Sequence, residues 1–203
     1  PILVLYVMLI VMGIPVVFFN GYYPTLSGTY SVCADNQAGG AELVRHLIDR
    51  GHTKIAGYFK SDDIQGHQRY SGFISELFRS GLIIPDENVF WYTTETKENL
   101  FDDPEEVLKR LGDNTAVVCY NDEVAFGLVK CLLSAGRRVP EDVAVVSFDN
   151  SNLSWISQVP ITSLSYEDRN IGRIAAQKLV DILDGRDVSS EVLPWTFIQK
   201  ESS

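Results

Sequence analysis

The stretch Thr115-Ala-Val-Val-Cys-Tyr-Asn-Asp-Glu-Val-Ala-Phe-Gly127 is the part of the sequence that decides the predicted fold. Its apolar residues form a continuous run, which is typical of a buried strand, and Asn121-Asp122 then opens a helix at once. A buried strand that leads directly into a helix indicates an open parallel α/β sheet. Ligands of such sheets bind at the carboxyl ends of the strands, because helix amino termini and unpaired backbone groups converge there.

Two further segments repeat this arrangement. The apolar run Lys54–Phe59 leads into Lys60-Ser-Asp-Asp-Ile-Gln65, and the run Val143–Phe148 leads into Asp149-Asn150. Three apolar strands thus deliver polar residues to one predicted edge of a sheet. This convergence predicts a binding site for a small polar molecule.

Composition limits the possible functions of the chain. Its 203 residues are 45% hydrophobic and 22% charged, which is ordinary for a globular protein. The formal net charge of −10 opposes direct binding to nucleic acid, since that binding normally needs a basic surface. Cys33, Cys119 and Cys131 lack metal-ligand spacing, so we expect buried free thiols and a cytoplasmic location.

The beginning of the chain allows two interpretations. Residues 1–19 carry no charge, and that length could span a bilayer or serve as a signal peptide. However, no Lys or Arg precedes the run, and Gly13 and Pro15 divide it. We therefore expect a turn and a buried strand after Gly13, and no membrane insertion. Residues 1–12 lack the amphipathic pattern of a surface helix.

Strands and helices alternate along the rest of the chain. We predict strands at about 16–20, 54–59, 89–93, 115–120 and 143–148, and a terminal strand at 192–198. We predict helices at about 36–50, 65–80, from near Pro104, 122–135 and 167–184, with a loop after the first strand and a linker at 160–166. This alternation indicates βαβ crossovers and parallel sheets.

Asn121, Asp122 and Asp149 are candidates for ligand contacts, although each could simply cap a helix or start a turn. The amide of Asn121 can donate to one hydroxyl group and accept from another. We therefore assign Asn121 to the ligand and Asp122 to the helix cap. The carboxylate of Asp149 can accept charge-assisted hydrogen bonds from two hydroxyls.

Arg69 is predicted to lie near the start of a helix, where a cation opposes the helix dipole. That misfit favours a specific role for its guanidinium, such as a fork onto vicinal hydroxyls. The alternative is a solvated surface arginine paired with Asp62 or Asp63. The sequence leaves both interpretations open.

Enzymatic functions are poorly supported. None of the three histidines (His46, His52 and His67) has a plausible nucleophile beside it. The chain contains no phosphate loop, no Gly-x-Gly-x-x-Gly, no Gly-x-Ser-x-Gly and no metal-ligand cluster. We expect no enzymatic activity, no cofactor and no bound metal.

Several motifs together carry a resemblance to a known family. They are Asp35-Asn-Gln-Ala-Gly-Gly-Ala41 with the following helix and strand to Ala56, Arg69-Tyr-Ser-Gly-Phe73, Tyr120-Asn-Asp-Glu-Val-Ala-Phe-Gly127 and Val139-Pro-Glu-Asp-Val-Ala-Val-Val-Ser-Phe-Asp149. In order and spacing, they resemble the effector domains of the lactose/galactose-repressor family over nearly everything from Gly13 onward. Lys60-Ser-Asp-Asp-Ile-Gln-Gly66 and Thr93-Thr-Glu-Thr-Lys-Glu98 more narrowly resemble arabinose-responsive repressors, which join such a domain to a winged-helix DNA-binding head.

The resemblance implies a type I periplasmic-binding-protein fold: two parallel-sheet α/β subdomains, joined by three crossovers, with a sugar in the cleft between them. Carried over by motif, Arg69, Asn121 and Asp149 form the polar core of the pocket. Asn20 matches an acidic or amide pocket position, and Gln65 lies one helical turn before Arg69. Further candidates for stacking on a sugar are the aromatic residues Tyr22, Tyr23, Trp91 and Trp155, although packing explains each of them as well.

The chain departs from the family pattern in two ways. It begins after the family's first strand-helix-strand-helix unit, so residues 1–31 and 164–187 are expected to form an incomplete N-terminal subdomain. Residues 32–163 and 188–203 are expected to form the C-terminal subdomain. These residues also contain no DNA-binding head, so operator DNA is expected to be bound only through a separate head.

The resulting functional prediction is a sugar-binding and dimerisation domain of a bacterial transcriptional repressor. The expected partners are a sugar effector, with L-arabinose as the favoured candidate, and a second copy of the chain. The alternative is a periplasmic sugar-binding protein that serves a transporter. The repressor is favoured because Val139–Asp149 resembles that branch more closely.

Overall fold

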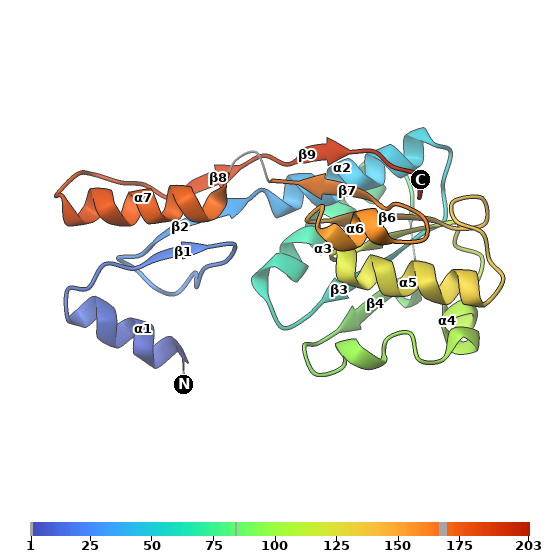
Figure 1. The fold of residues 1–203 in the computed structure, drawn as a ribbon, viewed down its shortest axis with the longest axis horizontal. Helices are drawn as coiled ribbons and strands as arrows, with labels where there is room; N and C mark the ends of the chain where they lie inside the picture. The colour runs from blue at the N-terminus through green and yellow to red at the C-terminus, as the bar shows by residue number, and fades with distance from the viewer. Residues whose placement is uncertain (1, 84, 167–169) are drawn as a thin grey trace. The chain divides into compact units, whose positions relative to one another are not determined.

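The computed structural model describes residues 2–83, 85–166 and 170–203. Figure 1 shows the order of its elements along the chain. The helices are α1 (Ile2–Val11), α2 (Asn36–Asp49), α3 (Ile64–Arg79), α4 (Pro104–Leu111), α5 (Asp122–Ser134), α6 (Asn152–Ile156) and α7 (Ile171–Leu183), with 3-10 turns η1 (Asp86–Asn88) and η2 (Lys97–Asn99). The strands are β1 (Val17–Phe19), β2 (Tyr30–Ala34), β3 (Ile55–Lys60), β4 (Val89–Tyr92), β5 (Ala116–Cys119), β6 (Ala144–Phe148), β7 (Thr162–Ser165), β8 (Glu191–Leu193) and β9 (Thr196–Ile198).

The chain forms two compact α/β units and passes between them three times. The first unit contains Pro1–Asp35 and Tyr166–Pro194, and the second contains Asn36–Ser165 and Trp195–Ser203. The predicted boundaries after residues 31, 163 and 187 therefore differ from those of the structure. The reason is pairing: β2 and β8 belong to the sheet of the first unit, in the order β1-β2-β8.

The second unit contains a six-stranded sheet in the order β4-β3-β5-β6-β7-β9. Its strands are parallel except for β9, which runs antiparallel to β7. Helices cover both faces. Tyr58 of β3 packs in the cluster formed with α4 and α5, whereas the ring of Phe59 lies 5.2 Å from that of Phe73 in α3. Because successive strand residues point to opposite faces, α3 and α5 lie on opposite sides of the sheet.

Two glycines bring α2 and α3 into close contact. A Cβ atom at Gly72 would collide with the backbone oxygen of Gln37, and one at Gly40 would collide with the backbone oxygen of Arg69. Gly72 of α3 therefore packs directly on α2. This contact fixes the position of α3 and, with it, the backbone at Arg69.

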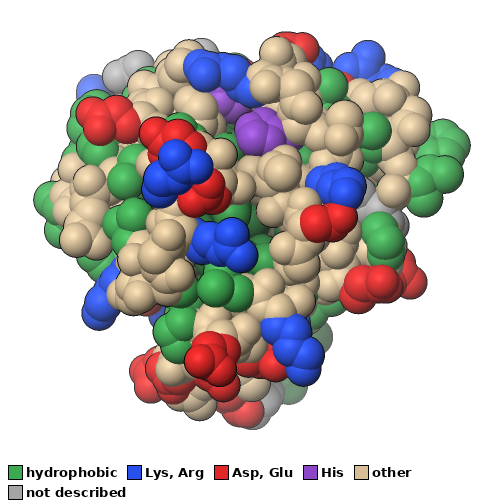
Figure 2. Space-filling view, turned by 90° about the vertical axis from the view of Figure 1, so that its right-hand side faces the viewer, with side chains coloured by type: hydrophobic (Ala, Val, Ile, Leu, Met, Phe, Trp, Pro, Cys, Tyr) green, Lys and Arg blue, Asp and Glu red, His purple; other side chains and the backbone are tan. Residues whose placement is uncertain are grey.

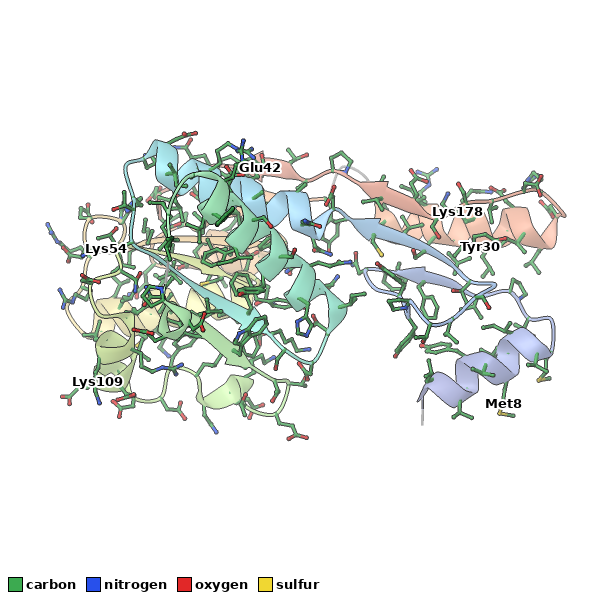
Figure 3. All side chains as sticks on the ribbon, turned by 180° about the vertical axis from the view of Figure 1, so that it is seen from behind. Met8, Tyr30, Glu42, Lys54, Lys109 and Lys178 are labelled. Atoms are coloured by element: carbon green, nitrogen blue, oxygen red, sulfur yellow. The ribbon has the colours of Figure 1, made fainter. Side chains whose placement is uncertain are left out.

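The first unit has a three-stranded parallel sheet, together with α1 and α7. The sequence assigned no secondary structure to residues 1–12. Residues Ile2–Val11 form α1 without an amphipathic pattern, and the Tyr6 ring packs 4.9 Å from that of Phe18. Figure 3 shows the side chains of this helix around Met8. Its exposed apolar residues are Leu3, Val4, Leu5, Val7, Met8 and Val11. Within the described part of the chain, no helix combines the length and apolar character needed to cross a membrane.

Three other local predictions need correction. Residues 160–166, predicted as a linker, contain β7, whose four Ser, Thr and Leu residues are buried between β6 and β9. The predicted terminal strand 192–198 is two strands, one in each unit. Part of the predicted loop after β1 is the strand β2. The long helix predicted at 167–184 is observed from Ile171, and residues 167–169 lie outside the described residues.

Candidate functional site

Arg69 is the centre of the polar site in the second unit. It lies in the second turn of α3 and is only 2% exposed. Its Nε atom donates to Asn36 Oδ1 at 2.9 Å, and its Nη1 atom donates to the backbone oxygen of Tyr120. Its Nη2 atom donates to Asp149 Oδ1 at 3.2 Å. One guanidinium thus joins the ends of β5 and β6.

The alternative of an exposed Arg69 paired with Asp62 or Asp63 is wrong. Those two carboxylates instead lie 3.5 and 3.2 Å from Lys60 Nζ. The Arg69 guanidinium is surrounded by aromatic rings. Its central carbon lies 4.7, 4.3 and 5.5 Å from the ring centroids of Tyr120, Phe148 and Trp195. Arginine suits such a site because its guanidinium is weakly hydrated and stacks on rings.

The helix cap is Asn121, whereas the sequence assigned the cap to Asp122. Asn121 is the cap of α5, and its Oδ1 atom accepts from Val124 N at 3.1 Å. The cap uses only the oxygen, so the amide nitrogen remains a donor suited to a ligand. Asp122 is the first residue of α5 and is 1% exposed, so it is neither the cap nor part of the surface.

Asp122 is the centre of a buried hydrogen-bond network that sequence reasoning missed. Its Oδ1 atom accepts hydrogen bonds from the hydroxyls of Ser147 and Ser163, and its Oδ2 atom accepts from Ser151 N. Burial raises the pKa of the Asp122 carboxyl, and the hydrogen bonds from these three residues oppose that rise. The sequence signal was Ser147, a polar residue within the otherwise apolar strand β6.

Asp149 lies directly after β6. Its side chain is 30% exposed, so one face of the carboxylate remains open while the other meets Arg69. The backbone φ angles of Asp149 and Asn150 are +96° and +46°. Residues with side chains rarely adopt such angles. Residues that do adopt them are found more often at binding sites than elsewhere.

Gln65 is connected to the same edge through Tyr120. The Tyr120 hydroxyl donates to Asp63 Oδ2 at 2.7 Å and lies 3.2 Å from Gln65 Oε1. Burial is the main cause that raises the pKa of this tyrosine, so it remains a neutral donor. The structure therefore brings Gln65, Arg69, Asn121 and Asp149 together at the carboxyl ends of β3, β5 and β6.

The other predicted residues occupy different places. Trp155 lies on α6 and is 56% exposed, with Lys200 Nζ 4.3 Å from the centroid of its ring. Asn20, with a φ of +57°, follows β1 in the first unit, and Tyr22 lies two residues further along that unit.

Two of the aromatic candidates make extensive ring contacts. Trp91 packs against Phe59, His67 and Tyr70. Tyr23 of the first unit packs against Tyr6 and Phe18. These contacts support the packing explanation for both residues.

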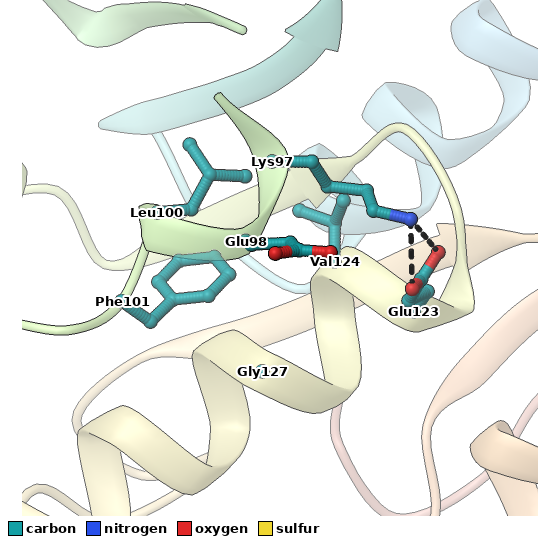
Figure 4. Close-up of a pocket in the computed structure, with 7 residues that line it drawn as sticks. All are labelled: Lys97, Glu98, Leu100, Phe101, Glu123, Val124 and Gly127. Carbon is teal, nitrogen blue, oxygen red and sulfur yellow. Dashed lines mark hydrogen bonds and ion pairs between the residues drawn. The ribbon is translucent and has the colours of Figure 1, made fainter. Parts of the chain in front are cut away.

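Three surface hollows of the second unit are lined by residues other than the candidate ligand residues. The pocket in Figure 4, of about 230 Å³, lies between η2 and the start of α5. It is lined by Lys97, Glu98, Leu100, Phe101, Glu123, Val124 and Gly127, and none of the predicted ligand residues is among them. We place the candidate site around Arg69 because charged and amide side chains converge there. Within the described residues, no group of three or more His, Cys, Asp or Glu side chains could hold a metal ion.

Sequence comparison places these observations in a family. The periplasmic binding protein-like domain matches residues 44–203. The arabinose metabolism transcriptional repressor of Halalkalibacterium halodurans is 36% identical over 177 residues, which are 85% of this chain and 46% of that protein. The corresponding repressor of Geobacillus stearothermophilus is 35% identical over 178 residues, or 86% of this chain and 49% of that protein. The chain thus spans about half the length of the curated relatives it matches.

Structural comparison agrees. A complex of the transcriptional regulator CelR with cellobiose has a TM-score of 0.87 and 30% identity, with 97% of this chain and 61% of that chain covered. A LacI family regulator from Enterococcus faecium with bound ribose has a TM-score of 0.83 and 26% identity, with 96% and 72% covered. These matches confirm the predicted fold class. The chain therefore belongs to the periplasmic binding protein-like domain family, in the form carried by LacI-type transcriptional regulators.

Proposed function

We propose that this chain binds a sugar effector through Arg69, Asn121 and Asp149, as the sensing part of a transcriptional repressor. The observation that carries the proposal is the pairing of a buried guanidinium with a partly open carboxylate at 3.2 Å. The guanidinium holds the carboxylate in place, the open oxygen accepts from sugar hydroxyls, and the Asn121 amide donates beside it. Such a set of donors and acceptors suits vicinal hydroxyl groups.

The relatives support a sugar as the ligand class. One structural relative holds cellobiose and another holds ribose. Two of the sequence relatives are arabinose metabolism repressors, so L-arabinose is the first candidate for this chain. The relatives reported above are transcriptional regulators, which favours repression over the alternative of sugar transport.

The proposed protein acts on operator DNA through a separate head. On the face shown in Figure 2, acidic and basic side chains are interspersed, and the net charge of −10 also disfavours direct DNA contact. The sugar changes repression only to the extent that it binds one conformation of the protein more tightly than another. We assign the protein to the cytoplasm, where its operator DNA would be.

The proposal also includes the first unit and a dimer. The first unit forms part of the N-terminal subdomain, and Asn20 and Tyr22 are its candidate ligand contacts. The protein acts as a homodimer. Exposed Ile156 of α6 borders a largely apolar hollow of about 290 Å³ that also includes Phe126 and Val129 of α5, which supports this surface as the dimer contact.

Calorimetric titration of the full-length protein with L-arabinose, D-ribose, cellobiose and D-glucose tests the ligand class. We expect one of these sugars to bind, and we expect Arg69→Ala and Asp149→Asn to abolish that binding. Arg138→Ala is the control, because Arg138 pairs with Asp142 on the surface instead. The proposal fails if no sugar binds, or if the two site variants bind as tightly as the control.

A further inference from the structure

The turn that carries Asp149 has an unfavourable backbone conformation. Asp149 and Asn150 are consecutive residues with side chains, and both have positive φ angles. Such a turn persists only when surrounding contacts hold it in place. The amide of Asp149 donates to the backbone oxygen of Leu164 at 2.8 Å, which is an ordinary contact between strand ends. The next two amides are held by side chains.

Both side chains belong to one buried network centred on Asp122. The amide of Ser151 donates to Asp122 Oδ2. The amide of Asn150 donates to Ser163 Oγ at 3.0 Å, and the Ser163 hydroxyl donates in turn to Asp122 Oδ1 at 2.7 Å. Asp122 is itself only 1% exposed, so a ligand at the open edge of Asp149 does not reach it.

The direction of these hydrogen bonds requires a carboxylate. The Ser163 oxygen accepts from the Asn150 amide, so its single proton must be donated elsewhere, and Asp122 accepts it. The Ser147 hydroxyl donates to the same carboxylate oxygen. An asparagine at position 122 has one acceptor oxygen and one amino group. Its single oxygen cannot face both the two serine hydroxyls and the Ser151 amide, so at least one of these donors loses its partner.

We propose that Asp122 is a positioning residue for the sugar site. It acts through the turn at residues 149–151 and holds the Asp149 carboxylate 3.2 Å from Arg69 Nη2. The inference rests on the proposed function, because it assigns Asp149 to the ligand. Asp122 does not touch the sugar itself. It keeps Asp149, which does, in the conformation that binds.

Asp122→Asn in the full-length protein tests the inference, with Ser202→Ala as the matched control. Ser202 is fully buried and its hydroxyl bridges Val145 and Thr162, but it makes no hydrogen bond to residues 149–151. Hydrogen exchange of the Asn150 and Ser151 amides needs no ligand. We expect these amides to exchange roughly tenfold faster in Asp122→Asn than in the control, and L-arabinose to bind roughly tenfold more weakly by calorimetry.

A second substitution separates positioning from a general loss of stability. Glycine adopts positive φ angles without strain, so adding Asn150→Gly to Asp122→Asn should restore part of the lost binding. Asn150→Gly alone is the reference, because it removes the hydrogen bond that Asn150 Oδ1 accepts from Lys200 Nζ at 2.7 Å. The inference is overturned if the two amides exchange as in Ser202→Ala, if binding is unaffected when they exchange faster, or if the glycine restores nothing. If the unsubstituted protein binds no L-arabinose, the arabinose assignment fails, while the exchange results still decide whether Asp122 holds the turn.

Discussion

The two units differ in how completely they cover their sheets. In the second unit, β5 and β6 are buried along their whole length, and helices cover both faces. In the first unit, β1 is only partly buried and most of the apolar side chains of α1 are exposed. A parallel sheet is stable when both of its faces are covered. The polar residues around Arg69 therefore lie in the unit whose sheet is more completely covered.

The largest expected difference between the units is in their cores. Phe73→Ala in α3 removes a ring that is fully buried against Phe59, and we expect a loss of about 3–5 kcal/mol in the free energy of unfolding. Leu5→Ala in α1 removes a side chain that is 53% exposed, and we expect a change of about 0.5 kcal/mol. Denaturant unfolding of both variants measures the contrast. Equal losses would show that α1 is covered in the full-length protein, and would contradict the difference in burial between the two units.

The next effect concerns the buried arginine of the site. Arg69→Met keeps much of the side-chain volume but leaves Asp149 and the Tyr120 carbonyl without their donor. We expect a loss of about 2–3 kcal/mol in the free energy of unfolding, below the range for a fully buried pair because Asp149 is partly exposed. We also expect sugar binding to weaken by about a hundredfold or more in calorimetry.

The matched control for this variant is Arg138→Met, because the Arg138 side chain is 68% exposed in its pair with Asp142. We expect that control to cost less than about 1 kcal/mol and to leave binding unchanged. If both arginines mattered equally to stability, the burial of Arg69 would not explain its role.

A smaller effect is expected within the well-packed unit itself. Tyr58 Oη is a buried side-chain atom without a hydrogen-bond partner in the part of the chain that the structure describes. An unpaired buried hydroxyl costs free energy, so we expect Tyr58→Phe to raise the free energy of unfolding by about 1 kcal/mol. Chemical denaturation tests this expectation. A clear loss of stability would instead indicate that the hydroxyl is paired, for example with a buried water.

The smallest effect is a pH dependence at the end of α2. Burial, and then the charge of Arg50, lower the pKa of His46, which bonds Ser203 Oγ and packs on Phe197. The pKa of His46 is therefore lower in the folded protein than in the unfolded chain. Neutral His46 contributes to the free energy of unfolding above the unfolded pKa of about 6.5, and this contribution is lost as the pH falls below that value. We expect His46→Gln to lose less stability than the unsubstituted protein between pH 7.5 and 5, measured by denaturant unfolding. An identical pH dependence would contradict this, although His52, whose pKa is also lowered, should retain part of it in both proteins.

The sequence by itself determined the alternation of strands and helices in the second unit and the residues at its strand ends. Continuous apolar runs form buried strands wherever they are paired, and the residue that follows each run must lie at the sheet edge. For that reason the amino-acid pattern alone places Asn121 and Asp149 at one edge. Segments with weak local patterns, such as β7 and α1, were missed because their conformation depends on neighbours rather than on their own residues.

The tertiary structure alone decided how these side chains are held. Asp122 is joined to Ser163 across 41 positions, and Arg69 to Asp149 across 80. No local pattern encodes such pairs, since they arise only when the crossovers bring strands from distant parts of the chain side by side. The choice between Asn121 and Asp122 as the helix cap depended on the same long-range contacts. Either residue can cap a helix, but only the one at position 122 meets the buried serines of β6 and β7.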